Sequence, residues 1–349
     1  MKTPKAKKLP SGNWRVQLQI DGKRYSCTGT SKKEAENAAK KLYAGFQIEK
    51  KSVLTVGKAI DKYIDAKEKV LSPSTVRGYK TIRKNHLQSL MDINLTELTP
   101  LDIQQAISAD QASGKSAKTI KNAHGLLSAM LKEFRPNFVS NPKLPQKKPQ
   151  EVRIFSEEEM KKVWAASKGT PYELPILLAS WLGLRQSEIK GLRFSDIQDG
   201  RLHIQRAIVK GTNGPVVKGT KTVSGDRWIK LPNVINTLVQ EEWAKLEERG
   251  VRPDMENYYI CPMSASAIYE NFIRICEKAG VKPCRFHDLR HFAASEAHSL
   301  GVPDKYAMRR MGHATDNMLK TVYQHTMRDK EDQFADVIDE HMEELFKQS

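Results

Sequence analysis

The segment HDLRHFAASEAHSLGVPDKYAMRRMGHATDNMLKTVY, residues 287–323, decides the architecture of the last third of the chain. It contains HDLRH at His287–His291, MGH at Met311–His313, and Tyr323 ten residues further on. Glycine tolerates the left-handed backbone that commonly ends a helix, so Gly280, Gly301 and the glycine of MGH predict helices with sharp ends. The polar groups of these motifs therefore fall near helix boundaries, where side chains can reach a cleft.

Four side chains from this region and from an earlier motif suit the binding of one anion. The earlier motif, GLRQSE, places Arg185 after a buried helix, and Glu188 can hold the Arg185 guanidinium from one helical turn away. Arg290 follows His287 by three residues, so both share a helix face, and His313 follows a helix end. Guanidinium groups keep their charge and bind several oxygens at once, which makes a phosphate the best-fitting anion.

Tyr323 is the candidate nucleophile for attack on such a phosphate. Charge that develops on the phosphate oxygens would be stabilised by the two arginines, so we expect neither a metal nor any other cofactor. His287 could accept the phenolic proton directly or through water. Lys221 is the candidate general acid if its pKa is lowered by desolvation or by nearby cations, and Lys218 in the same hairpin is its rival.

A zinc hydrolase is the competing interpretation of the HDLRH motif. His287 and His291 stand at i and i+4, as in zinc-binding helices, and His313 could be a third ligand. The acid between them is Asp288 rather than the longer glutamate, and Arg290 would place a cation beside the metal. These two features favour phosphate over zinc.

The composition independently favours a polyanionic partner. The 349-residue chain has a net charge of +17, which suits nucleic acid, with an anionic membrane as the rival. The sequence has no run of 18 apolar residues, so no membrane partner is expected. The N-terminal MKTPKAKK precedes no apolar segment and the four cysteines form no CxxC pair, which together favour a cytoplasmic protein. The charge is uneven: residues 1–51 carry +9, residues 52–150 carry +8 and residues 330–349 carry −5.

Residues 1–51 predict a small sheet followed by a helix. Alternating apolar residues over 14–20, an Asp-Gly turn and a return strand over 23–28 indicate a hairpin, and the helix runs over about 31–49. Arginine and glutamine side chains can make paired hydrogen bonds to base edges. The expected DNA contacts of this module are Arg15, Gln17, Gln19, Lys23 and Arg24.

Residues 53–135 predict an all-helical domain with basic residues between its apolar positions. Phosphate contact is an interpretation of these charges beside that of an ordinary solvated face. The expected contacts are Arg77, Lys80, Arg83, Lys84, Lys118 and Lys121. A proline-rich basic linker, 136–154, separates this domain from residues 155–330, where helices predominate around a small antiparallel sheet over 201–231.

At these motifs the chain resembles the tyrosine recombinases, in particular the integrases of temperate phages and integrative elements. GLRQSE matches the first box of that family, HDLRH the second, and MGH followed by Tyr323 the third; Phe292 stands where the family usually has threonine. The resemblance implies an α+β multidomain fold. Residues 1–51 would be the arm-type DNA-binding domain, 53–135 the core-binding domain and 155–330 the catalytic domain.

The resemblance also implies roles and partners. Arg185 and Arg290 would clamp the scissile phosphate, and His313 would bind one of its oxygens. Tyr323 would form a 3′-phosphotyrosyl link, His287 would assist proton transfer, and Lys221 would protonate the leaving 5′ oxygen. Glu188 fills the acidic position of the first box. The enzyme would act as a homotetramer on double-stranded arm-type and core-type sites in the host nucleoid, integrating and excising a prophage or mobile element. An excisionase and a host DNA-bending protein would assist. A relaxing topoisomerase is one alternative, which the separate arm-type domain disfavours. A non-catalytic DNA-binding regulator is another, which the complete set of catalytic residues disfavours.

The acidic segment 331–349 predicts an amphipathic C-terminal helix. Phe334, Ile338, Met342 and Leu345 form an apolar stripe on an otherwise charged surface. Packing on its own domain is the simple interpretation. In the family this helix docks on a neighbouring protomer, so it could couple subunits and control the position of Tyr323.

Overall fold

The computed structural model describes residues 5–20, 22–52, 54–146, 153–219, 225–250, 256–312 and 342. The chain divides into two compact units, residues 1–147 and 148–349. Lys221, His313, Tyr323 and, apart from Met342, the expected C-terminal helix over 331–349 lie outside the described residues. Within the described ranges, no helix has the length and apolar character needed to span a membrane.

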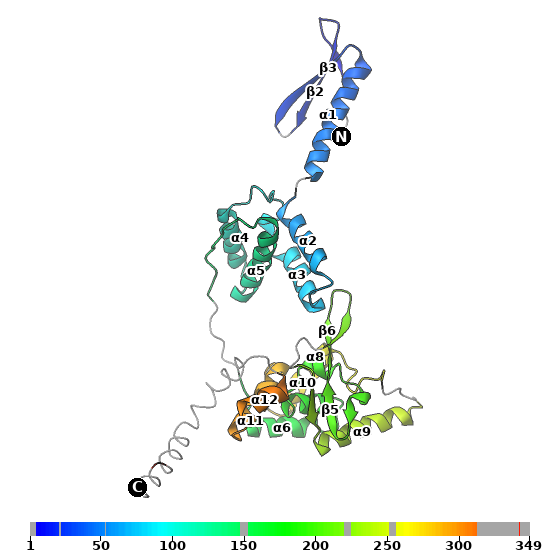
Figure 1. Cartoon of the computed structure of the whole chain (residues 1–349), viewed down its shortest axis with the longest axis vertical. Coiled ribbons are helices and arrows are strands. Elements are labelled where there is room, and N and C mark those ends of the chain that lie inside the picture. Colours follow the sequence, from blue (N-terminus) through cyan, green and yellow to red (C-terminus); the bar gives the residue numbers. More distant parts are fainter. Residues whose placement is uncertain are drawn as a thin grey trace. The chain divides into compact units, whose positions relative to one another are not determined.

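The first unit begins with the expected sheet and helix (Figure 1). Strands β1 (Lys7–Lys8), β2 (Trp14–Ile20) and β3 (Lys23–Gly29) form an antiparallel sheet in that order, and α1 (Lys32–Ser52) packs against β2 and β3. The buried side chains are Ala6, Val16, Leu18, Ile20, Ala35 and Ala39. The alternation of apolar and polar residues along β2 therefore determines which face of the sheet meets the helix.

The other face of this sheet is open and polar. The register places Arg15 opposite Thr28 and Gln19 opposite Arg24, and all four residues are exposed. Lys23 is different, because it pairs with the buried Ile20 and so shares the parity of the helix-covered face. Four of the five expected DNA contacts thus share one face: Arg15, Gln17, Gln19 and Arg24.

The first unit continues with the expected helices. They are α2 (Val56–Lys67), α3 (Pro73–Asn85), the short 3₁₀ helix η1 (Gln88–Leu90), α4 (Pro100–Ala112) and α5 (Ala117–Phe134). Thr99 and Asp102 form a reciprocal capping box at the start of α4, with Pro100 in the first turn. The apolar faces of α2 to α5 share one core, which includes Ile60, Ile103 and Leu127.

The second unit is mainly helical with two small sheets. Its helices are α6 (Glu157–Ser167), α7 (Glu173–Ser180), α8 (Gln186–Ile189), η2 (Phe194–Asp196), α9 (Asn233–Glu248), α10 (Ala265–Lys278), η4 (Phe286–Asp288), α11 (Leu289–Ser299) and α12 (Asp304–Met311). Its strands are β4 (Ile197–Gln198), β5 (Arg201–Ile204), β6 (Arg206–Lys210), β7 (Pro215–Gly219) and β8 (Arg227–Lys230). The mixed α+β multidomain fold expected from the sequence is confirmed.

The single sheet expected over 201–231 is wrong in detail. Strands β4, β5 and β8 form one antiparallel sheet, whereas β6 and β7 form a separate hairpin. The chain leaves the first ladder at Gln205, whose side-chain amide donates to Asp196 Oδ1 at 2.8 Å, and the Arg206 guanidinium donates to the same oxygen at 2.5 Å. A buried carboxylate therefore directs the chain from one sheet to the other, which strand periodicity could not predict.

The glycines expected to end helices do so. Gly280, Gly301 and Gly312 follow α10, α11 and α12, with φ values of 67°, 69° and 67°. Helix α11 packs against α7, and α12 packs against α11 and β8. The ends of α7, α12 and β8 are thereby brought near the start of α11, although they come from distant parts of the sequence.

Candidate active site

The turn at Gly183 places Arg185 beside helices α11 and α12. Gly183 has a φ of 66°, and a Cβ there would lie 3.0 Å from Met311 Cγ and 3.6 Å from Ala293 Cβ. The following residue, Leu184, returns to the core by donating its amide to the Leu178 carbonyl at 3.1 Å. Glycine thus allows both the left-handed turn and the close approach of α12.

The Arg185 side chain joins two elements. Its Nη1 donates to Glu188 Oε1 at 2.6 Å, and its Nη2 donates to the Gly312 carbonyl at 2.9 Å. The Glu188 carboxylate also accepts the Arg185 backbone amide at 3.0 Å. The side chain is 36% exposed, so part of the guanidinium remains open to a ligand.

Arg227, at the start of β8, is a member of this network that the sequence analysis did not select. Its Nη2 donates to Glu188 Oε2 at 3.1 Å, its Nε to the Arg310 carbonyl at 2.8 Å and its Nη1 to the Gly225 carbonyl at 3.1 Å. The side chain is only 4% exposed. A signal was present: Arg227 is a charged residue at a position where the β8 alternation buries its neighbours Ile229 and Leu231.

Arg290 is completely buried at the start of α11. Its Nη1 donates to the Gly183 carbonyl, which fixes the second motif against the turn of the first. Burial, followed by the positive charge of Arg185, lowers the pKa of Arg290 to about 9, which leaves the guanidinium cationic at neutral pH.

Two guanidinium groups, those of Arg185 and Arg227, contact the Glu188 carboxylate, and the Arg290 guanidinium lies close enough to feel their charges. Burial opposes ionisation of Glu188, but the charges of Arg227 and Arg185 and their hydrogen bonds outweigh it and hold its pKa below the usual range. The cluster formed by Arg185, Glu188, Arg227 and Arg290 therefore carries a net charge of about +2 when all four groups are ionised. Such a charge in a poorly solvated place favours an anionic ligand.

His287 lies next to this cluster in η4. Burial of its ring, and then the charge of Arg290, lower the pKa of His287 to about 4, although the residue still has an exposed surface. The imidazole is therefore neutral at physiological pH and can accept a proton.

The remaining groups of HDLRH are organised differently from a zinc motif. The Asp288 carboxylate accepts two hydrogen bonds from the Arg285 guanidinium, at 3.0 and 2.8 Å. The rings of His287 and His291 meet edge to face with centroids 5.8 Å apart. Among the described residues, which do not include His313, no group of three potential metal ligands is present.

The structure places Arg185, Glu188, His287 and Arg290 close together, and their roles in catalysis stay predictions. Lys221, His313 and Tyr323 lie outside the described residues, so their predicted places are not tested. Lys218, the rival general acid, is in β7 and pairs with Ala207 of β6. Gly312, whose carbonyl Arg185 holds, immediately precedes His313.

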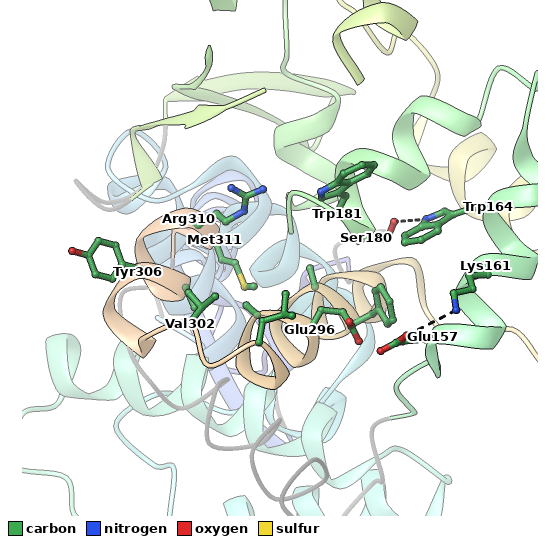
Figure 2. Close-up of a pocket in the computed structure, with 15 residues that line it drawn as sticks. Glu157, Lys161, Trp164, Ser180, Trp181, Glu296, Val302, Tyr306, Arg310 and Met311 are labelled. Carbon is green, nitrogen blue, oxygen red and sulfur yellow. Dashed lines mark hydrogen bonds and ion pairs between the residues drawn. The ribbon is translucent and has the colours of Figure 1, made fainter. Parts of the chain in front are cut away.

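An apolar groove lies on another face of α12. It encloses about 700 Å³ between α6, α7, α11 and α12 and includes Trp164, Trp181, Phe292 and Tyr306 (Figure 2). Arg310 and Met311 also line it, so the end of α12 borders both the groove and the arginine cluster.

In the first unit, two expected DNA contacts are already ion-paired. Arg83 donates to Asp61 through Nε and Nη2, at 3.0 and 3.1 Å, and to the Gly57 carbonyl at 3.1 Å. Lys80 donates to Glu68 at 2.8 Å. The other expected contacts of this domain are exposed or close to the surface: Arg77, Lys84, Lys118 and Lys121.

Comparison with known proteins identifies the family of the second unit. Residues 153–330 match the model of the "Phage integrase family", and residues 55–109 match "Phage integrase, N-terminal SAM-like domain". The chain belongs to the phage integrase family. It is a site-specific DNA recombinase of the tyrosine type, an enzyme that breaks and rejoins DNA, and neither the regulator nor the zinc hydrolase is favoured.

Individual relatives and solved structures agree with this assignment. A "Tyrosine recombinase XerC-like" protein of Caldanaerobacter subterraneus subsp. tengcongensis is 26% identical, covering 86% of this chain and 87% of its own. The integrase of Mycobacterium phage FRAT1 is 28% identical, covering 76% and 83%. The Tn1549 transposon integrase in complex with transposon right end DNA has a similar fold, with a TM-score of 0.67, 18% identity and coverage of 81% of this chain and 100% of that chain.

Proposed function

We propose that the arginine cluster of this integrase binds the scissile phosphate of its DNA sites. The observation that carries this proposal is the excess of positive charge around Glu188. Arg185 and Arg290 are the two members on the motif helices, and a phosphate would offset their charge while accepting their hydrogen bonds. Arg227 already donates from each of its three guanidinium nitrogens, to Glu188 and to two backbone carbonyls, so it is assigned no contact with substrate.

In the proposed reaction, the Tyr323 oxygen attacks phosphorus and the bond from phosphorus to the 5′ oxygen breaks. The phenolic proton passes to His287, directly or through water, and Lys221 gives a proton to the departing 5′ oxygen. His313 hydrogen-bonds a phosphate oxygen. The resulting 3′-phosphotyrosyl bond preserves the energy of the phosphodiester, so rejoining to a new 5′ hydroxyl reverses these steps without ATP or metal.

The low pKa of His287 keeps its imidazole unprotonated, as a proton acceptor must be, but makes it a weak base before substrate binds. The unliganded imidazole is neutral because it is partly buried beside Arg290. A bound phosphate would bring negative charge to the same place and would raise the pKa of His287. Its affinity for a proton would therefore increase when the substrate arrives.

Residues 1–51 and 53–135 would bind arm-type and core-type sites on double-stranded DNA. In support, the first module has an open face bearing Arg15, Gln17, Gln19 and Arg24. In the helical domain, Arg77 and Lys84 are exposed and have no ion pair among the described residues, so they suit phosphates better than Arg83, which is paired with Asp61 between α3 and α2. An excisionase and a host DNA-bending protein would select between integration and excision of the element.

Recombination would take place in a homotetramer. A lambda integrase tetramer bound to a Holliday junction shares the fold, with a TM-score of 0.55 and 18% identity over 92% of this chain and 95% of that chain. In this chain, segment 331–349 would dock on a neighbouring protomer through its apolar stripe. The groove beside α12 offers a matching apolar surface, where Trp181 is 42% exposed and Tyr306 is 66% exposed.

A suicide substrate tests the proposed function. Double-stranded core-site DNA with a nick near the cleavage position loses a short fragment after cleavage, which traps the covalent intermediate. In EDTA, the wild-type protein should form a protein–DNA adduct that is absent from the Tyr323→Phe variant. An adduct that persists in Tyr323→Phe, or that forms only without EDTA, would refute the proposal.

A further inference from the structure

The end of α12 is held by two arginines from other elements. Arg227 of β8 donates to the Arg310 carbonyl and Arg185 to the Gly312 carbonyl. Arg310 lies in the last turn of α12 and Gly312 caps the helix, and backbone oxygens at a helix end have no partner within the helix. The two arginines also share the carboxylate of Glu188. One buried carboxylate thus connects both arginines that hold the end of α12.

We propose that Arg227 is a positioning residue for DNA cleavage, which sets the geometry of Arg185 through Glu188 and holds the end of α12 through the Arg310 carbonyl. This inference rests on the proposed function of the arginine cluster. Arg227 itself would not touch the phosphate, because each of its three guanidinium nitrogens already donates to a protein group.

The position of Arg227 gives it access to three parts of the site at once. It begins β8, which follows the sequence segment that contains Lys221, and its Nη1 holds the carbonyl of Gly225, two residues before the strand. Its Nη2 holds the first motif at Glu188, and its Nε holds the carbonyl of Arg310, the residue before the third motif. A shift of one part relative to another by about 1 Å is enough to slow a positioned reaction by about 100-fold.

The chemistry requires arginine rather than any cation. A guanidinium has donors spread over a rigid plane and can serve Glu188, Arg310 and Gly225 together. A lysine would keep the positive charge beside Glu188, but its single ammonium group cannot reproduce that planar arrangement. Arg227→Lys is therefore the informative variant, because it preserves the buried ion pair while removing the geometry.

The test combines three measurements on the full-length protein with Arg227→Lys. We expect near-wild-type affinity for core-site DNA in a gel-shift assay, adduct formation on the suicide substrate slowed by about 100-fold, and faster amide hydrogen exchange over residues 308–312 without DNA. Thermal melting reports whether the variant is folded. Arg227→Met is a second variant, expected to show the same pattern with a larger loss of stability.

Arg206→Lys is the matched control. Arg206 is a largely buried arginine of the same unit, 15% exposed, whose ion pair is with Asp196 rather than Glu188. It should lower the melting temperature while leaving the cleavage rate per folded molecule and the exchange of 308–312 unchanged.

The possible outcomes separate this inference from the proposed function. Wild-type cleavage by Arg227→Lys, or unchanged exchange at the end of α12, would overturn the positioning role even if the wild-type protein forms its adduct. A cleavage loss matched by Arg206→Lys would also overturn it. If the wild-type protein formed no adduct, the proposed function would fail, and the exchange measurement would still decide whether Arg227 holds α12.

Discussion

The buried arginine cluster and the open face of the N-terminal sheet use the same kind of side chain in opposite ways. Arg227 and Arg290 are nearly inaccessible, and their guanidinium groups donate to protein acceptors. Arg15 and Arg24 are exposed on a two-stranded surface beside glutamines. A buried, oriented cation can stabilise a transition state with little reorganisation, whereas an exposed one contributes mainly affinity that salt weakens. Substitutions in the arginine cluster should therefore change the cleavage rate, and substitutions on the open sheet face should change the affinity for DNA.

Replacing Arg290 should produce the largest effect and should change rate rather than affinity. In Arg290→Lys, the charge remains but the two-point contact with a phosphate is lost, so adduct formation should fall by about 100- to 1000-fold. Binding of core-site DNA should change little. Single-turnover trapping and a gel shift measure the two quantities. Arg285→Lys, an exposed arginine in the preceding turn that pairs with Asp288, is the control and should retain activity.

Replacing Glu188 tests whether the cluster depends on its single carboxylate. In Glu188→Gln, the buried arginines lose their counter-charge, and the free energy of unfolding at neutral pH should fall by about 3 kcal/mol. The pKa of Glu188 is lower in the folded state than its ordinary value of 4.5. Its contribution to stability is therefore present above that value and is lost as the pH falls through the lower folded-state pKa.

Urea unfolding of both proteins across an acid series measures this dependence. The difference in stability between wild type and Glu188→Gln should shrink as the pH falls below 4.5. A difference that stays constant across the series would mean that the Glu188 charge does not stabilise the cluster.

The open sheet face should show the reverse behaviour, with affinity changing and rate preserved. Arg24→Ala should weaken binding of arm-type DNA and reduce the slope of log affinity against log salt by about 1, if that side chain contacts one phosphate. Cleavage of a substrate with core sites only should be unchanged. Lys23→Ala is a close control, because Lys23 is the adjacent residue on the other face of the sheet. Equal effects from both variants would contradict the assignment of one DNA-binding face.

The smallest effects are expected for two adjacent residues of α3, one paired with a protein carboxylate and one exposed to solvent. Arg83 is paired with Asp61, so Arg83→Ala should cost about 1 kcal/mol of stability. Lys84 is exposed, so Lys84→Ala should leave stability unchanged and lower the salt slope by about 1 if it contacts a phosphate. Chemical denaturation measures the change in stability, and salt-dependent binding measures the change in slope. If Arg83→Ala lowered the salt slope while Lys84→Ala lowered stability, the ion pair with Asp61 would not prevent Arg83 from binding DNA.

Several features of the fold could be predicted because they depend on local chemistry. The hairpin of β2 and β3 follows from strict alternation around an Asp-Gly turn, and α4 follows from Thr99, Pro100 and Asp102. The positive φ at Gly280, Gly301 and Gly312 follows from their places after helical stretches. The separation of β6 from β5 could not be predicted, because it depends on Asp196, which meets Gln205 and Arg206 only in the folded domain.

The sequence by itself determined which motif residues could form the site. Arg185, Glu188, His287 and Arg290 occur in motifs whose residue types indicate binding of an anion and transfer of a proton. Only the tertiary structure decided how they are connected. The Gly183 carbonyl receives Arg290, the Gly312 carbonyl receives Arg185, and Glu188 joins both of these motifs to Arg227. These contacts unite residues up to 127 positions apart, and their acceptors are mostly backbone carbonyls. Every residue carries a backbone carbonyl, so no sequence pattern can mark the ones that a buried guanidinium will find.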